Sequence, residues 1–264
     1  MTEQMRVRPT AVAGLGAFVV YVVVIVLVQS TSGVDYDDLA ASSGNIWRAG
    51  ILSLGVGAAV VAGLTVWFGW WRAATVETVR SRRRWTLVAP ALYLLVVVGN
   101  LAVTDWGAVE VGFLLSAAAL GVAVGFAEEL TCRGTLLVGL RGTAREVVVW
   151  LTTCVLFGAM HGVNVLFGAE VGTTLQQVVM AGMQGSAFYV LRRVLGRLVW
   201  AMALHGLWDF SIFVQAASDG GTNLLGLLVY PTALVSLVAG FVVARDAGRS
   251  SGEPAVRSAS ASST

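Results

Sequence analysis

The sequence contains no lysine, and its 17 basic residues are all arginine. Charged residues make up only 12% of the chain, which is about half the share found in a soluble globular domain. The two cysteines, Cys132 and Cys154, lie in apolar segments, which argues against a disulfide framework and against a CxxC-type metal site. The net charge of +2 gives no indication of a nucleic-acid partner, because the arginines lie in short loops.

Apolar residues dominate what is present. They make up 57% of the 264 residues, and the mean hydropathy is +0.80. These values predict an all-α membrane protein, a polytopic bundle built as one helical domain. The apolar runs are each long enough to cross a bilayer as a helix; they cover residues 11–28, 46–71, 85–104, 109–139, 147–166, 173–190, 198–214 and 224–243.

The charges of the loops test this count of eight helices. Along the chain the connections alternate between basic ones, such as 72–84, and acidic ones, such as 29–45. Arginine marks cytoplasmic loops, so the alternation predicts eight spans with both termini in the cytoplasm. A secretory signal is the rival interpretation of residues 11–28, but this run is longer than a signal's apolar region and is expected to be retained.

The order of the apolar runs and motifs also predicts how the chain divides into domains. Residues 1–107 are predicted to form the first three helices, and residues 108–244 to form a catalytic core of helices four to eight. The Ser- and Ala-rich residues 245–264 are predicted to be a disordered cytoplasmic tail.

Ionisable residues inside the apolar runs are the features that need an explanation. Glu128, Glu129 and Arg133 lie in the fourth run, and each charge costs about 2.5–3.5 kcal/mol at the bilayer centre. Glu129 and Arg133 are four residues apart and share a helix face, so they are expected to pair. Glu128 is then left unpaired for chemistry.

The only two histidines of the chain fall at a similar mid-membrane level. At 1.5 Å per residue, Glu128 lies roughly 16 Å above the inner end of its helix, His161 roughly 21–24 Å, and His205 with Asp209 roughly 12–18 Å. His205 and Asp209 are again four residues apart. The sequence therefore predicts a mid-membrane cavity formed by the fourth, fifth and seventh helices.

Three ordered motifs carry a family resemblance. They are Glu128-Glu129-Leu-Thr-Cys-Arg133, Phe157-Gly-Ala-Met-His161 with Asn164 following, and His205-Gly-Leu-Trp-Asp209. Together they resemble the CPBP family of intramembrane proteases, also called the CAAX-processing and bacteriocin-processing, or Abi, family. The resemblance covers about residues 125–210, and it departs from the family at Cys132, where an aromatic residue is more common.

The resemblance implies a glutamic endopeptidase that cleaves a membrane-associated protein or peptide, in the manner of CAAX processing and without a cofactor. It implies that Glu128, with His161, activates a water molecule, while His205 and position 209 stabilise the oxyanion. Asp209 can donate a hydrogen bond only when it is protonated, and otherwise orients His205. Glu129, Arg133 and Asn164 would support the site, although the first two could be purely structural and Asn164 could be a helix cap.

Two other classes of function remain open. A zinc-dependent intramembrane metalloprotease could use Glu128, His161 and His205 as metal ligands, although the sequence has no His-Glu-x-x-His motif. A non-catalytic membrane scaffold or immunity factor, or a proton-coupled transporter, could also hold a buried polar cluster. In each case we expect a multi-pass protein of a bacterial plasma membrane.

Overall fold

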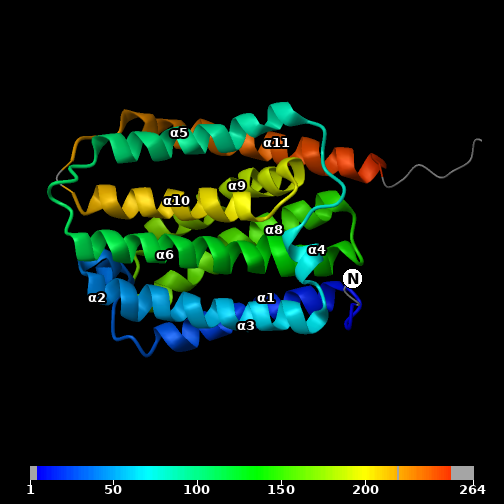
Figure 1. The fold of residues 1–264 in the computed structure, drawn as a ribbon, viewed down its shortest axis with the longest axis horizontal. Coiled ribbons are helices and arrows are strands. Elements are labelled where there is room, and N and C mark those ends of the chain that lie inside the picture. The colour runs from blue at the N-terminus through cyan, green and yellow to red at the C-terminus, as the bar shows by residue number, and fades with distance from the viewer. Residues whose placement is uncertain (1–4, 219, 251–264) are drawn as a thin grey trace, which may run out of the picture.

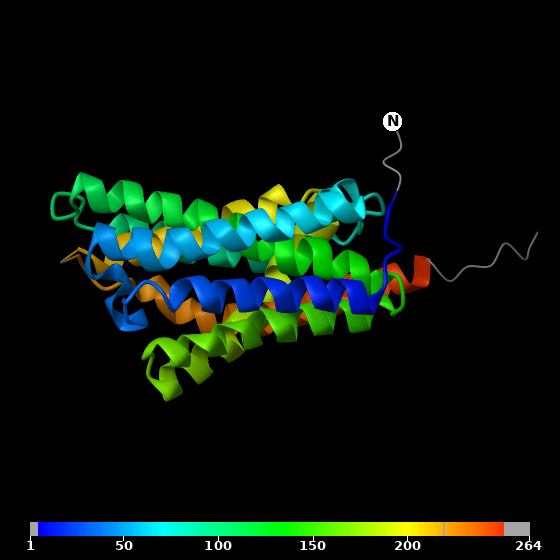
Figure 2. The same cartoon turned by 90° about the horizontal axis from the view of Figure 1, so that it is seen from below.

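The computed structural model describes residues 5–218 and 220–250, and the long helices in it run side by side along the longest axis of the molecule (Figures 1 and 2). No β-strand occurs within these residues, and the one isolated bridge joins Val76 to Arg197. The predicted all-α fold is confirmed. In chain order the helical segments are α1 (Ala11–Gln29), η1 (Tyr36–Ala41), α2 (Ser43–Asn45), η2 (Ile46–Ile51), α3 (Leu52–Phe68), α4 (Trp71–Thr75), η3 (Arg84–Leu87), α5 (Val88–Val103), α6 (Val111–Glu129), η4 (Leu130–Leu136), α7 (Leu137–Arg141), α8 (Glu146–Met160), η5 (His161–Phe167), α9 (Val171–Leu195), α10 (Val199–Ala216), η6 (Leu224–Leu228) and α11 (Val229–Ser250).

Within the described residues, six helical stretches are long and apolar enough to cross a membrane, which makes the chain a multi-pass membrane protein. They are Ala11–Gln29, Ser43–Phe68, Arg84–Val103, Val111–Arg141, Glu146–Phe167 and Leu224–Ala247. The predicted sixth and seventh spans are helices too, α9 and α10, but they fall outside this set. Polar side chains such as Gln177 and Gln184 in α9, and His205 and Asp209 in α10, dilute their apolar sequence.

Several predicted boundaries differ from the structure, among them the end of the second span and the start of the tail. The span 46–71 ends earlier, because Gly69 adopts a left-handed conformation (φ 73°) after Phe68. Trp70, which follows this turn, is fully buried, and its indole N–H donates to the carbonyl of Val7 at 2.7 Å. At the other end of the chain, α11 continues to Ser250 through the start of the predicted tail, whose residues 251–264 lie outside the described part.

Glycines allow α6 and α10 to approach closely. A Cβ atom added to Gly121 would lie 2.6 Å from the carbonyl oxygen of Gly206, and one added to Gly206 would lie 2.5 Å from that of Gly121. Small residues are the usual means of close helix contact in membranes. The contact brings together the two helices that carry Glu128 and His205.

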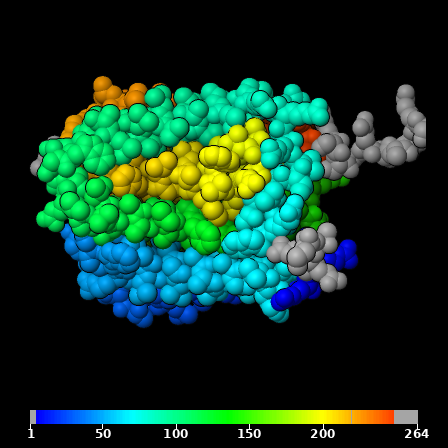
Figure 3. Space-filling view, viewed as in Figure 1, coloured from blue at the N-terminus to red at the C-terminus, as the bar shows by residue number. Residues whose placement is uncertain are grey.

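The segment between α4 and η3 crosses one end of the bundle, where it runs over the surface in Figure 3 (cyan). Backbone hydrogen bonds tie it to the end of α9, from Glu77 N to Gly196 O at 3.0 Å and from Ser81 N to Arg193 O at 2.8 Å. We call this the arginine-rich end, because it carries the arginines of residues 72–84, 141–145 and 192–197. The opposite end, formed by residues 30–45, 104–110 and 168–170, has no basic residue in these ranges, and Arg48 follows in η2.

Candidate active site

The fourth predicted helix changes its winding immediately after the two glutamates. Residues Leu130–Leu136 form the π-helical segment η4, and every one of them is buried. A π-helical turn breaks the regular ladder of backbone hydrogen bonds and is frequent at functional sites. Here the guanidinium of Arg192 in α9 donates to the backbone carbonyls of Arg133, of Ala74 (2.5 Å) and of Ala73 (2.7 Å). The turn is therefore held by a side chain from another helix.

Glu129 makes two contacts through one carboxylate oxygen. Its Oε1 atom lies 2.8 Å from Nη1 of Arg133 and 3.2 Å from Nδ1 of His205. Glu129 and Arg133 are both fully buried, and His205 is nearly so. The pairing with Arg133 agrees with the spacing, whereas the contact with His205 could not be read from the sequence.

Glu128 has a different environment from its neighbour. Its Oε2 atom lies 3.9 Å from Nε2 of His161 and 3.9 Å from Nε2 of His205, and it has no hydrogen-bond partner. The other nitrogen of His161, Nδ1, lies 2.8 Å from the carbonyl oxygen of Phe157. A carbonyl only accepts, so Nδ1 carries the hydrogen and a neutral His161 turns its unprotonated Nε2 toward Glu128.

Two other predicted residues, Asp209 and Asn164, have polar contacts with residues other than Glu128. Asp209 lies with Oδ2 3.8 Å from Nε2 of His205. Asn164 donates to Oε1 of Gln177 at 3.0 Å, and Gln177 donates to the hydroxyl of Tyr36 at 3.1 Å. Asn164 therefore joins η5 to α9 and η1 rather than touching the glutamates.

The aromatic ring of Phe157 organises the charged side chains. The guanidinium carbon of Arg133 lies 3.8 Å from its centroid, and the rings of His161 and His205 meet it edge-on at 5.2 and 5.5 Å. Phe188 stacks on His205 with 4.8 Å between centroids. These contacts restrict the side-chain rotation of both histidines.

A cavity of about 380 Å³ contains the predicted residues. Glu128, His161, His205, Asp209 and Asn164 line it together, while Glu129 and Arg133 lie behind its wall. The residues that sequence reasoning missed are Tyr36, Gln177 and Gln184, which line the same cavity. Their only signal in the sequence is that they are polar residues in or beside apolar helices.

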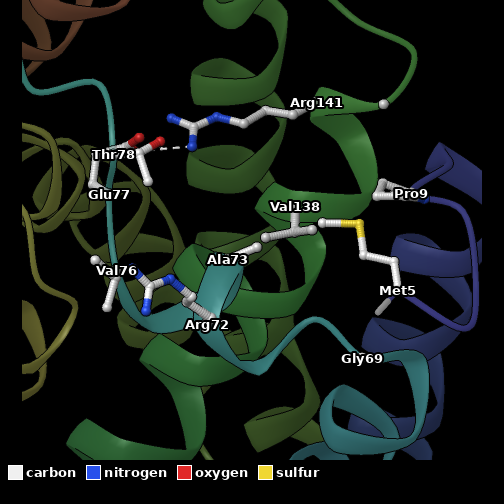
Figure 4. A pocket seen from close by; sticks show the side chains of 11 residues that line it. Met5, Pro9, Gly69, Arg72, Ala73, Val76, Glu77, Thr78, Val138 and Arg141 are labelled. Atoms are coloured by element: carbon white, nitrogen blue, oxygen red, sulfur yellow. Dashed lines mark ion pairs between the residues drawn. The ribbon is translucent and has the colours of Figure 1, made fainter. Parts of the chain in front are cut away.

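A second, larger hollow of about 740 Å³ lies at the arginine-rich end (Figure 4). Met5 and Val138 form an apolar wall, and Arg141 pairs with Glu77 at 2.8 Å beside it. It contains none of the residues that the sequence predicts to be catalytic. Among the residues that the structure describes, no group of three or more His, Cys, Asp or Glu side chains is arranged to hold a metal ion.

Comparison with protein families gives one match, over residues 110–211, to the family described as type II CAAX prenyl endopeptidase Rce1-like. Over these residues the chain is similar to the Rce1-like family. The match covers less than half of the chain, and it includes α6 and most of α10, hence all three motifs. Comparison with curated proteins and with solved structures gave no match.

The Rce1-like match confirms the resemblance to the CPBP family and supports a CAAX-type membrane protease in general. The first three helices lie outside the matched segment. Residues that precede the matched segment nevertheless line the cavity, such as Tyr36 in η1 and Ser53 in α3, so the N-terminal part is built into the same site.

Proposed function

We propose that this chain is an intramembrane glutamic endopeptidase in which Glu128, with His161, activates the attacking water. The observation that carries the proposal is that the two adjacent glutamates have different partners. Glu129 is paired with Arg133 and His205, whereas Glu128 faces a cavity with an unpartnered oxygen 3.9 Å from two histidines. A general base must be free to accept a proton.

The reaction needs a water between Glu128, His161 and the scissile carbonyl. Glu128 accepts a proton from this water while the water oxygen forms a bond to the carbonyl carbon, which leaves a tetrahedral oxyanion. The proton then passes to the leaving nitrogen as the C–N bond breaks, and the carboxylate is restored. The spacing of 3.9 Å between Glu128 and each histidine is too long for direct hydrogen bonds and suits a bridging water.

His205 takes the role of oxyanion stabiliser in this proposal. Its Nδ1–H donates to Glu129 at 3.2 Å, and in the charged imidazolium form Nε2, which faces Glu128 and Asp209, carries the second hydrogen that donates to the oxyanion. Asp209 supports His205 as a nearby carboxylate, and Arg133 neutralises Glu129. Asn164 contributes to the cavity wall through its bond to Gln177.

We further propose that α9 and α10 cross the membrane, giving eight spans with both termini in the cytoplasm of a bacterial cell. Both helices lie alongside the apolar ones in Figure 1, and their polar residues line the cavity. A polar residue that faces the interior of a bundle does not prevent a helix from spanning. The arginine-rich end is then cytoplasmic.

The substrate in this proposal is a membrane-associated peptide or protein, and neither a cofactor nor nucleic acid takes part. The test compares peptide termini in cells that express the wild-type protein or Glu128→Gln at equal levels. Termini present only with the wild type support the proposal, and identical termini contradict it.

The alternatives predict other results in the same system. Loss of cleavage by the purified protein with phenanthroline, restored by zinc, would favour the metalloprotease. A scaffold, immunity factor or transporter predicts no cleavage, with Glu128→Gln changing only abundance or transport.

A further inference from the structure

The cavity extends toward only one end of the bundle. Its lining includes Gln29 at the end of α1, Tyr36 and Leu39 in η1, and Asn164 in η5, all from the end opposite the arginines. No described residue of the arginine-rich end lines it.

Closely packed side chains lie between the cavity and the arginine-rich end. Arg133, Leu136, Leu137 and Arg192 have exposed fractions of 0%. The guanidinium of Arg192 fills the space between η4 and α4 by donating to backbone carbonyls on both. A polypeptide therefore has no path to Glu128 through this layer.

We infer that the cavity is entered from the membrane face opposite the arginine-rich end. Arginine marks the cytoplasmic face, so the entrance is extracytoplasmic. Calling the occupant a substrate rests on the proposed function. The substrate would be a membrane-anchored or exported polypeptide whose scissile bond lies in the outer half of the bilayer.

Cysteine labelling tests the entrance without any substrate. Cys132 and Cys154 are buried and are replaced by alanine to give a cysteine-free background. Ser53→Cys then reports the cavity, Asp37→Cys the opposite end and Thr78→Cys the arginine-rich end. A membrane-impermeant maleimide is applied to right-side-out and to inverted vesicles, with detergent-solubilised protein as the measure of total thiol.

The expected result is that Ser53→Cys and Asp37→Cys react in right-side-out vesicles and Thr78→Cys in inverted ones. Reaction of Ser53→Cys from the same face as Thr78→Cys would overturn the inference. Absence of reaction from either face, with reaction in detergent, would overturn it too. Since no cleavage is measured, this outcome is independent of whether the chain is a protease.

A separate observation concerns Gln184 in α9. Its side chain lines the cavity, is only 8% exposed, and its Nε2 atom has no hydrogen-bond partner. A buried donor without a partner is unfavourable and rare in a folded protein. Because it lies in the wall of the cavity, it is available to a ligand that brings an acceptor.

The neighbouring residue, Gly185, packs the backbone of α9 closely at this point. At Gly185 an added Cβ atom would collide with Nη2 of Arg133 and would lie 3.3 Å from Cδ1 of Phe157. The backbone of α9 is thus packed directly on the side chains that hold Glu129 and the histidines. A buried donor that already lines the cavity is in place when charge develops on a substrate.

The geometry points to Gln184 as a hydrogen-bond donor to the scissile carbonyl oxygen, a role that rests on the proposed function. Asp209, where the family pattern also allows Asn, cannot donate as a carboxylate. The neutral amide of Gln184 supplies the donor that position 209 lacks. His205 and Gln184 would then stabilise the oxyanion together.

The test uses Gln184→Met, which has a similar length and no donor. We expect kcat to fall about 10²- to 10³-fold with little change in KM, as for other oxyanion donors. The unliganded variant should unfold at or above the wild-type temperature, because the unpartnered amide is gone. The matched control is Gln176→Met in the same helix, because Gln176 is exposed and bonds to Tyr230 instead.

An unchanged kcat in Gln184→Met would overturn the role, as would a change confined to KM. A lowered unfolding temperature would indicate a structural residue and also overturn it. These results differ from a failure of the proposed function, in which the wild-type protein itself would not cleave.

Discussion

The Nδ1 atom of His205 lies 3.2 Å from Oε1 of Glu129, the oxygen that also pairs with Arg133. This contact joins two helices that are far apart in the chain. It gives Glu129 a second partner, so that its charge fixes the orientation of a cavity histidine. The adjacent Glu128 stays without a hydrogen-bond partner at Oε2.

Glu129→Gln is expected to destabilise the protein by about 3–5 kcal/mol, because it leaves the buried charge of Arg133 without its partner. Chemical or thermal unfolding in detergent measures the effect. Glu110→Gln is the matched control, since Glu110 is exposed just before the same helix. Equal stability of the two variants would contradict the structural role of Glu129.

Gly185→Ala is expected to destabilise the bundle by about 1–3 kcal/mol, the usual cost of overpacking. The added methyl group would collide with the guanidinium of Arg133. Gly182→Ala, three residues earlier in α9, should be tolerated, because its nearest neighbours would lie at 3.4 and 3.8 Å. Unfolding temperatures of the two purified variants check the prediction, and a tolerated Gly185→Ala would refute it.

Glu77 gives a prediction about pH. Burial alone would raise the pKa of Glu77, but the guanidiniums of Arg141, Arg193 and Arg192 outweigh this and lower the pKa below its ordinary value of 4.5. A lowered pKa in the folded state adds stability that is present above the ordinary pKa and lost as the pH falls through the folded pKa.

The wild-type protein should therefore exceed Glu77→Gln in unfolding free energy by about 3–5 kcal/mol at neutral pH. The difference should shrink below pH 4.5. Asp37→Asn, an exposed carboxylate at the opposite end, serves as the control for general charge effects. A difference in unfolding free energy that does not depend on pH would contradict the stabilisation of ionised Glu77 by the three arginines.

Much of the fold was predictable because it depends on local sequence. The apolar runs located the long helices to within a few residues, and α1 begins at Ala11 as expected. The end of α3 was less clear, because a turn at Gly69 interrupts a sequence that remains rich in tryptophan. Composition does not distinguish apolar residues in lipid from apolar residues buried in a turn.

The clustering of the candidate residues was predictable from the sequence, but the contacts between them were not. Glu128, His161, His205 and Asp209 line one cavity, as their shared depth suggests. The contact of Glu129 with His205 depends on how two helices rotate toward each other, which periodicity does not specify. The π-helical turn at η4 is bonded by Arg192, a residue that the sequence marks only as part of a basic loop.

Arg192→Lys is expected to weaken the support of that turn. A lysine has one ammonium group and cannot reach carbonyls in η4 and α4 with the fixed fork of a guanidinium. We expect lower stability and a lower kcat, whereas Arg197→Lys, an exposed neighbour, should change neither. Unfolding and cleavage assays on both variants test this prediction. Wild-type stability and kcat in Arg192→Lys would show that Arg192 does not support the turn.

The central claim is that Glu128 is the base. The most direct measurement is the cleavage rate of a quenched fluorescent membrane peptide by the reconstituted wild-type protein, by Glu128→Gln and by the control Glu110→Gln. A peptide cut by the wild type in cells is used as the substrate. The account predicts that Glu128→Gln folds normally and loses cleavage by at least about 10²-fold, while Glu110→Gln cleaves at the wild-type rate. Cleavage by folded Glu128→Gln at a rate close to that of the wild type would contradict it.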